Sequence, residues 1–124
     1  FLKLVASDLG PDVLPEIVKE VSGKAEIIVD GGFMRGSDVI KAIALGADTV
    51  AIGKLQGFGL AADGVAGIVR VLELLETEMR ITMGLLGETS LDALSTAHLH
   101  PAAPVYQSHA LSGLPYLNFK DPEY

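Results

Sequence analysis

The chain has 124 residues, of which 49% are hydrophobic and 20% charged, with a mean hydropathy of +0.42, a balance that excludes a disordered or fibrous polypeptide and predicts a globular one. Nine basic residues against sixteen acidic ones give a net charge of −7, the wrong sign for a protein that binds a nucleic-acid backbone. The chain has no cysteine, which is compatible with the reducing cytoplasm where we expect it to act, and no apolar run approaches the ~18 residues of a transmembrane helix.

The first half of the chain alternates helix-like and strand-like segments. An apolar residue recurs every three or four positions over residues 12–21, which predicts an amphipathic helix. These apolar residues are Leu14, Ile17 and Val21. Pro15 lies in the first turn, where a missing N–H costs no hydrogen bond, and Gly23 supplies a left-handed stop. The β-branched run at residues 27–29 predicts a strand buried on both faces, as in a parallel sheet covered by helices.

The same alternation repeats in the following residues. A helix is expected to start at Gly36 or Ser37 and to stop at Gly46. Its inward residues are Ile40, Ile43 and Ala44. A second short, buried strand is predicted at residues 49–52 and ends at Gly53.

A glycine-containing loop over residues 56–64 is expected to lead into a long helix that ends at Gly87. The inward face of this helix carries apolar residues at helical spacing. They are Ile68, Leu72, Leu75, Met79, Met83 and Leu86. Glu76 and Arg80 lie on another face, where their four-residue spacing favours an ion pair.

This order of elements, with short connections, predicts an α/β fold with parallel strands. Two strands expose both edges of a sheet and cannot bury both faces, so we expect a piece of a larger fold. After about Ser90 the periodicity is lost and prolines recur, which predicts an extended tail that wraps a surface or reaches a neighbouring subunit. For His98 and His100 in this tail we favour a surface or interface role over metal binding, because no carboxylate cluster lies near them in sequence.

Two junctions between a strand and the following helix, residues 29–36 and 51–54, carry the groups best suited to chemistry. In parallel α/β folds, ligands collect at the carboxyl ends of strands. Adjacent glycines let backbone N–H groups approach an anion, and Arg35 and Lys54 add positive charge, so a phosphate site is indicated. From spacing alone, tight turns explain the glycines equally well. For Asp30 we favour a functional role, because burying a carboxylate at the end of a strand costs free energy unless it has hydrogen-bond partners.

A longer pattern covers both junctions. It consists of Leu14-Pro15-Glu16-Ile17, then Ile28-Val29-Asp30-Gly31-Gly32-Phe33-Met34-Arg35-Gly36-Ser37-Asp38-Val39-Ile40-Lys41-Ala42-Ile43-Ala44-Leu45-Gly46-Ala47, then Ile52-Gly53-Lys54 and Gly59-Leu60-Ala61-Ala62. These motifs, in this order over roughly residues 11–94, resemble the C-terminal part of the FMN-dependent α-hydroxy acid oxidases and dehydrogenases, the family of glycolate oxidase, lactate oxidase and mandelate dehydrogenase.

The resemblance implies a (β/α)8 TIM barrel. The chain would supply its last two β/α units within residues 1–94, followed by the extended tail over residues 95–124. The strands at residues 27–29 and 49–52 would be the seventh and eighth of the barrel, beside the phosphate site usual for such folds.

The resemblance also implies that FMN is the cofactor and that the full-length enzyme oxidises a 2-hydroxy acid to a 2-oxo acid. Asp30 would bind the ribityl hydroxyls, the glycines would lend backbone contacts near the phosphate, and Lys54 would be the phosphate-binding cation. The residues expected to contact the cofactor are Asp30, Gly31, Gly32, Phe33, Met34, Arg35, Gly53 and Lys54. The family has arginine at the positions of Met34 and Lys54, so Arg35 is a candidate to compensate for the lost guanidinium groups.

The catalytic part of the family site is not expected in this chain. The family's base is a histidine in a His-Gly-Gly-Arg segment just before the region matched by residues 8–17, and its arginine binds the substrate carboxylate. Residues 1–7 contain neither residue type, so we expect no catalytic residue and no metal ligand here, and an inactive chain on its own. Because the chain begins with Phe1, we expect the rest of the barrel to precede it, and the resemblance implies a homo-oligomer, commonly a tetramer.

Two alternatives stay open at this point. A non-catalytic phosphate-binding or assembly module would account for Met34, Lys54 and the missing histidine and arginine. Another phosphate-binding barrel, such as a relative of inosine-monophosphate dehydrogenase or of the flavin-dependent isopentenyl diphosphate isomerase, would share the Asp-Gly-Gly and Ala-Leu-Gly-Ala segments.

Overall fold

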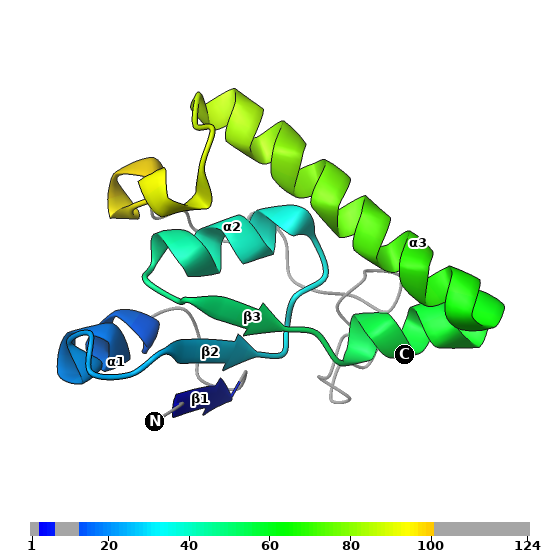
Figure 1. Cartoon of the computed structure of the whole chain (residues 1–124), viewed down its shortest axis with the longest axis horizontal. Helices are drawn as coiled ribbons and strands as arrows, with labels where there is room; N and C mark the ends of the chain where they lie inside the picture. The colour runs from blue at the N-terminus through cyan, green and yellow to red at the C-terminus, as the bar shows by residue number, and fades with distance from the viewer. Residues whose placement is uncertain (1–2, 7–12, 101–124) are drawn as a thin grey trace, which may run out of the picture.

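The computed structural model describes residues 3–6 and 13–100. In chain order, the elements are β1 (Lys3–Ala6), α1 (Leu14–Val21), β2 (Ile27–Asp30), α2 (Gly36–Ala44), β3 (Thr49–Ala51) and α3 (Lys54–Leu86). The three strands form one parallel sheet in the order β1-β2-β3, so each strand pairs with its neighbour in sequence. Their arrows point the same way in Figure 1, and their carboxyl ends therefore lie at one edge of the sheet.

The predicted helix boundaries of α1 and α2 are confirmed to within a few residues. Pro15 lies in the first turn of α1, and the helix ends in two left-handed residues, Ser22 (φ 47°) and Gly23 (φ 73°). α2 begins at Gly36 with Arg35 as the residue before it, and the chain turns at Gly46 (φ 102°). Left-handed backbone at both stops explains the glycines there.

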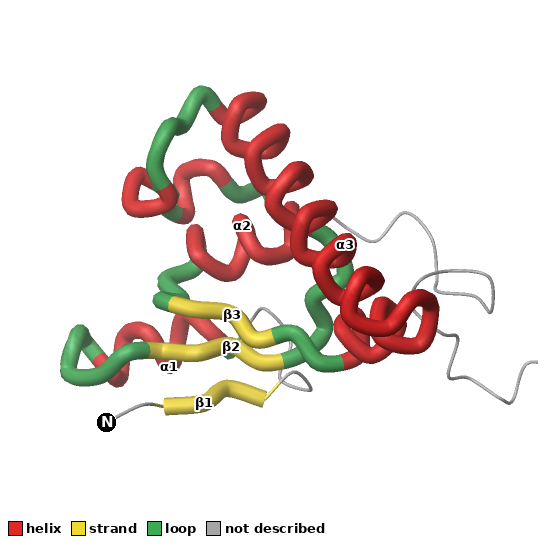
Figure 2. The backbone as a smooth tube through the Cα atoms, turned by 45° about the vertical axis from the view of Figure 1, so that its right-hand side comes forward, coloured by secondary structure: helices red, strands yellow, loops and turns green. Residues whose placement is uncertain are grey.

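The hydrophobic core lies on two sides of α2. One buried cluster joins α1, β2 and α2, and its members are Leu14, Val21, Ile27, Phe33, Val39, Ala42 and Ala47. The other joins α2 to α3 and to the residues after it, through Ile40, Ala44 and Leu94 with Met79, Met83, Leu86 and Leu99 packed against them. α2 thus lies between the sheet and the long part of α3 (Figure 2).

The structure contains one strand more than the two predicted. β1 pairs in parallel with β2, Lys3 opposite Ile27 and Ala6 opposite Asp30. The segment Lys-Leu-Val-Ala has one β-branched residue, whereas β2 begins with three, and its partner lies more than twenty residues away in sequence, so local pattern did not identify it.

The predicted loop over residues 56–64 was wrong, because α3 already begins at Lys54. Leucine, glutamine and alanine favour helix in this segment despite its glycines. The helix breaks only at Asp63 (φ −156°) and Gly64 (φ 51°), which separate a short first segment from the long second one. The two segments then cross closely, since a Cβ on Gly59 would lie 2.8 Å from the carbonyl oxygen of Gly67.

The inward stripe predicted for the long helix is confirmed in part. Leu75 is buried, but Leu72 is 52% exposed, so its inward assignment was wrong. Figure 1 shows the long segment of α3 running obliquely past the much shorter α2, so α2 covers only part of its length. The ion pair predicted between Glu76 and Arg80 is confirmed, with 2.7 Å between Oε1 and Nη2.

The first residues of the predicted tail are folded. Two 3-10 turns, Leu91–Ala93 and Thr96–His98, follow α3 and return the chain to α2. Leu94 is buried there and Leu99 packs beside it, so this part of the chain is not extended. Residues 101–124, including the rest of the predicted tail, lie outside the described residues.

Candidate functional site

β2 and β3 end side by side. Asp30, the last residue of β2, pairs in register with Ala51, the last residue of β3. The N–H of Gly31 donates to the carbonyl oxygen of Ala51 across 3.2 Å. The two junctions singled out from the sequence therefore meet at the carboxyl edge of the sheet (Figure 1).

The backbone of both junctions is accessible. Gly31 (φ 89°) and Gly32 (φ 78°) are both left-handed, a succession that residues with side chains rarely adopt. A Cβ added to Gly32 or to Gly53 would meet no atom within 4 Å. Asp30, half-buried, carries its carboxylate at the same edge. Backbone amides and one carboxylate are thus presented to the space beyond the strand ends.

The N-terminus of α3 is open to an anion. Gly53 precedes the helix without a capping side chain, and the first turn contains no acidic residue. The first hydrogen bond of the helix runs from the N–H of Gly57 to the carbonyl of Gly53, over 3.0 Å. The N–H groups of the three residues between, Lys54 to Gln56, therefore lack intrahelical partners. Lys54 is exposed and adds a positive charge to the positive end of the helix dipole.

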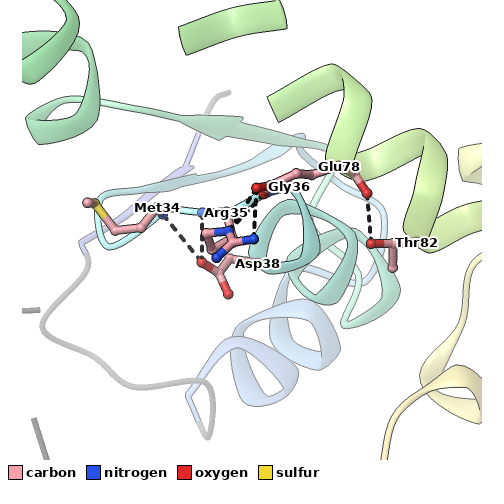
Figure 3. Close-up of polar contacts among 6 residues, drawn as sticks. All are labelled: Met34, Arg35, Gly36, Asp38, Glu78 and Thr82. Atoms are coloured by element: carbon pink, nitrogen blue, oxygen red, sulfur yellow. Dashed lines mark hydrogen bonds and ion pairs between the residues drawn. The ribbon is translucent and has the colours of Figure 1, made fainter. Parts of the chain in front are cut away.

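The N-terminus of α2 is closed by side chains of the chain itself (Figure 3). Asp38 accepts hydrogen bonds from the N–H groups of Met34 (3.3 Å) and Arg35 (3.1 Å). Glu78, on α3, accepts one from the N–H of Gly36 (2.7 Å). Three successive backbone donors that could have bound a ligand are therefore already paired with carboxylates.

Arg35 is part of the same network. Its Nε donates to both carboxylate oxygens of Glu78, at 2.9 and 3.0 Å, and its Nη2 lies 2.9 Å from Oε1. The hydrogen bonds from Arg35, and then that from the Gly36 N–H, hold the pKa of Glu78 below its usual value. The same contact raises the pKa of Arg35. The guanidinium is thus directed to Glu78 on α3 and not to Gly31 or Gly32 of the glycine loop, the segment over residues 31–35 that follows β2.

Two of the residues expected to contact the cofactor lie mainly against protein. Phe33 is buried, with 7% of its surface exposed, in the cluster that joins α1, β2 and α2. Met34 is half-buried and lines a cavity of about 100 Å3, together with Leu55, Leu75 and Glu78. The structure therefore brings Asp30, the three glycines and Lys54 to one edge, and gives Phe33 and Met34 packing roles beside it.

Sequence reasoning missed two residues of this region, Asp38 and Glu78. Asp38 stands three residues after Arg35, where an acidic side chain can close a helix N-terminus, so a local signal existed. Glu78 lies 42 residues from Gly36 along the chain, and nothing local relates the two. In the sequence it is one of several charged residues of a long helix.

Other features of the described residues lie away from this edge. A cavity of about 630 Å3 lies at the amino ends of the strands, lined by residues such as Lys24, Ile27 and Asp48. His98 pairs with Glu88 at 3.0 Å, and the described residues contain no group of three metal-ligand side chains. Among the helices of residues 13–100, none is long and apolar enough to span a bilayer.

Comparison with known proteins gives a consistent result. An L-lactate oxidase from Nostoc is 48% identical over 89 residues, which cover 72% of this chain and 24% of that protein. Glycolate oxidase 3 of Arabidopsis thaliana is 46% identical over 86 residues, which cover 69% of this chain and 23% of that protein. A structure of mandelate oxidase with (S)-2-phenylpropionate superposes with a TM-score of 0.65 and 48% identity, over 68% of this chain and 25% of that one.

The chain spans about a quarter of the length of these relatives. A related mandelate oxidase structure contains an FMN adduct. The family model of the FMN-dependent dehydrogenases matches residues 9–101, about three quarters of the chain. With two strand ends, a glycine pair and an open helix N-terminus at one edge, this chain belongs to the FMN-dependent dehydrogenase family.

Proposed function

We propose that this chain supplies the phosphate and ribityl part of the FMN site in an enzyme that oxidises a 2-hydroxy acid to a 2-oxo acid. The observation that carries the proposal is the open N-terminus of α3, with three N–H groups lacking helical partners and Lys54 beside them. Relatives named for L-lactate and glycolate oxidation support the substrate class.

The residues at this edge fit FMN by their chemistry. A phosphate needs convergent N–H donors and positive charge, which the N-terminus of α3, Gly53 and Lys54 provide. Ribityl hydroxyls need an acceptor, which Asp30 provides, and left-handed Gly31 and Gly32 let their backbone approach without a Cβ in the way. Phe33 fixes the loop from the core side, and Met34 and Arg35 form its outer edge.

We further propose that the sheet is the closing part of a (β/α)8 barrel, with β2 and β3 as its seventh and eighth strands. Three parallel strands paired in sequence order support this proposal, because a barrel of this kind has the same order. β1 would then be the sixth strand. The short first segment of α3 corresponds to the extra helix whose N-terminus binds phosphate in many such barrels.

Oxidation of a 2-hydroxy acid releases one hydride equivalent, which carries two electrons, and one proton; FMN, when bound, would supply the two-electron acceptor. The residues of this chain bind and orient it. Around the phosphate edge of the described residues there is no histidine, and His98 is paired with Glu88 beyond α3. The resemblance to the family implies that the acid–base chemistry comes from residues outside this chain, and we propose the same.

The remaining barrel is the first partner we propose. Val65 is 77% exposed and Leu85 84% exposed on α3, although both are apolar. Such exposure on a long helix is typical of a surface that another part of a protein covers. A homo-oligomer, a tetramer by resemblance, is the second proposed partner.

A flavin-binding assay tests the proposal in the protein as its complete gene encodes it. We expect the protein to bind FMN, with flavin absorption bands that bleach when lactate, glycolate or mandelate is added without oxygen. Lys54→Ala should weaken FMN binding, whereas Lys24→Ala, at the opposite edge of the sheet, should not. A protein that takes up no FMN would contradict the proposal, and one that binds FMN without bleaching would favour a non-catalytic module.

A further inference from the structure

Glu78 joins the long segment of α3 to the loop that follows β2. Its carboxylate receives Nε and Nη2 of Arg35 and the N–H of Gly36, all within 3.0 Å (Figure 3). Arg35 and Gly36 are 43 and 42 residues away along the chain. One side chain thus fixes both the last residue of the glycine loop and the first residue of α2.

We propose that Glu78 is a positioning residue for the cofactor phosphate. Its side chain closes the N-terminus of α2 and holds the glycine loop against α3. This inference rests on the proposed function. Glu78 does not touch the phosphate in this assignment, and it acts through Arg35 and Gly36.

The first step of the argument concerns charge. The N–H groups of Met34, Arg35 and Gly36 are all occupied by the carboxylates of Asp38 and Glu78. A phosphate placed there would compete with two anions and find no free donor among these three. The N-terminus of α3 has neither an acidic residue in its first turn nor a capping side chain. Of the two helix N-termini at this edge, only that of α3 is therefore open to the phosphate.

The second step concerns distance. A Cβ on Gly36 would lie 2.6 Å from Cβ of Glu78 and 2.6 Å from the carbonyl oxygen of Leu75. The two helices α2 and α3 are therefore in contact here, too close for a side chain at position 36. Met34, on the loop, and Leu55, in the first turn of α3, line one small cavity with Glu78. Glu78 therefore sets the spacing between the glycine loop and the helix N-terminus that would share the phosphate.

The test compares FMN with riboflavin, which lacks the phosphate. In the complete protein, we expect Glu78→Gln to raise the Kd for FMN about tenfold, because one charged pair is lost, and to leave the Kd for riboflavin unchanged. Flavin fluorescence quenching measures both constants. Glu76→Gln is the matched control, because Glu76 lies on the same helix and pairs with an arginine, Arg80, away from the loop.

A second variant keeps the test decisive if Glu78→Gln fails to fold. The side chain of Arg35 is 68% exposed, so Arg35→Lys should fold. Because lysine lacks the planar guanidinium, this variant should raise the Kd for FMN about threefold and leave the Kd for riboflavin unchanged. An equal loss of affinity for FMN and for riboflavin in a folded variant would assign Glu78 a purely structural role and overturn the inference. Unchanged FMN binding in both variants would overturn it too. A wild-type protein that binds no FMN would instead overturn the proposed function itself.

Discussion

α2 and α3 both begin directly after a strand at the same edge of the sheet, yet their N-termini are opposites. At the start of α2, the carboxylates of Asp38 and Glu78 occupy the N–H groups of Met34, Arg35 and Gly36. The first turn of α3 follows Gly53 and carries Lys54, with no acidic residue and no capping side chain. Carboxylates of the protein thus occupy three backbone donors at one helix end, whereas the other helix end has no capping side chain.

The difference shows how a fold can make two similar helix N-termini unequal as anion-binding positions. Any helix N-terminus attracts an anion, because its N–H groups lack partners and its dipole is positive. Internal carboxylates remove that attraction at one end and stabilise the helix there. The position that we propose for the phosphate therefore depends as much on the helix end that is closed as on the one that is open.

The largest expected effect comes from closing the open end. Lys54→Glu removes the cation and puts a carboxylate at the N-terminus of α3, where it favours the helix but repels phosphate. We expect the Kd for FMN to rise about 100-fold in the complete protein, with riboflavin binding and Tm unchanged or slightly improved. Fluorescence titration and a thermal melt measure these quantities. Unchanged affinity for FMN would contradict the placement of the phosphate at the N-terminus of α3.

The second prediction tests the contact that closes α2. Gly36→Ala puts a Cβ 2.6 Å from the backbone of Leu75 and Met79, where helix atoms cannot yield without a shift of α3. We expect the free energy of unfolding to fall by about 2 kcal/mol, the usual cost of overpacking. Urea denaturation measures it, and Gly84→Ala on α3, where an added Cβ meets no atom within 4 Å, is the control. A neutral Gly36→Ala would mean that the crossing of the two helices is loose.

Much of the fold followed from local pattern. The apolar spacing in α1 and α2 predicts these helices, and the β-branched residues of β2 and β3 predict these strands. β1, with the sequence Lys-Leu-Val-Ala, has a single β-branched residue, and the start of α3 was hidden by Gly57 and Gly59, residues typical of loops. There the fold depends on pairing and packing with distant residues, which no local pattern records.

The candidate site divides in the same way. Asp30, the glycines and Lys54 could be predicted because the residues after parallel strands lie at one edge, whatever the rest of the fold. Arg35 was predicted as a cofactor contact from its charge and from the family resemblance, and the structure pairs it with Glu78. Its partner stands more than forty residues later, so only the folded chain reveals it.

The third prediction concerns the stability of the open helix end. Gly57 lies in the first segment of α3, and a Cβ there meets no atom within 4 Å. Gly57→Ala should therefore raise the free energy of unfolding by roughly 0.5–1 kcal/mol, the ordinary gain for alanine over glycine in a helix. Urea denaturation again provides the measurement, and FMN affinity should stay the same. A loss of stability would show that this segment is not helical in the complete protein.

The smallest effect is expected from pH at the closed end. The pKa of Glu78 is lowered in the folded protein from its ordinary value of 4.5, chiefly by hydrogen bonds from Arg35. A carboxyl group of this kind contributes stability above its unfolded pKa, and the contribution is lost as pH falls through the folded pKa. We expect wild type to exceed Glu78→Gln in stability at pH 7, and the difference to shrink below about pH 4.5. The effect should be small, because water screens an exposed pair. Urea denaturation at a series of pH values measures it against Glu76→Gln, and a difference that is constant with pH would assign the loss to packing instead of charge.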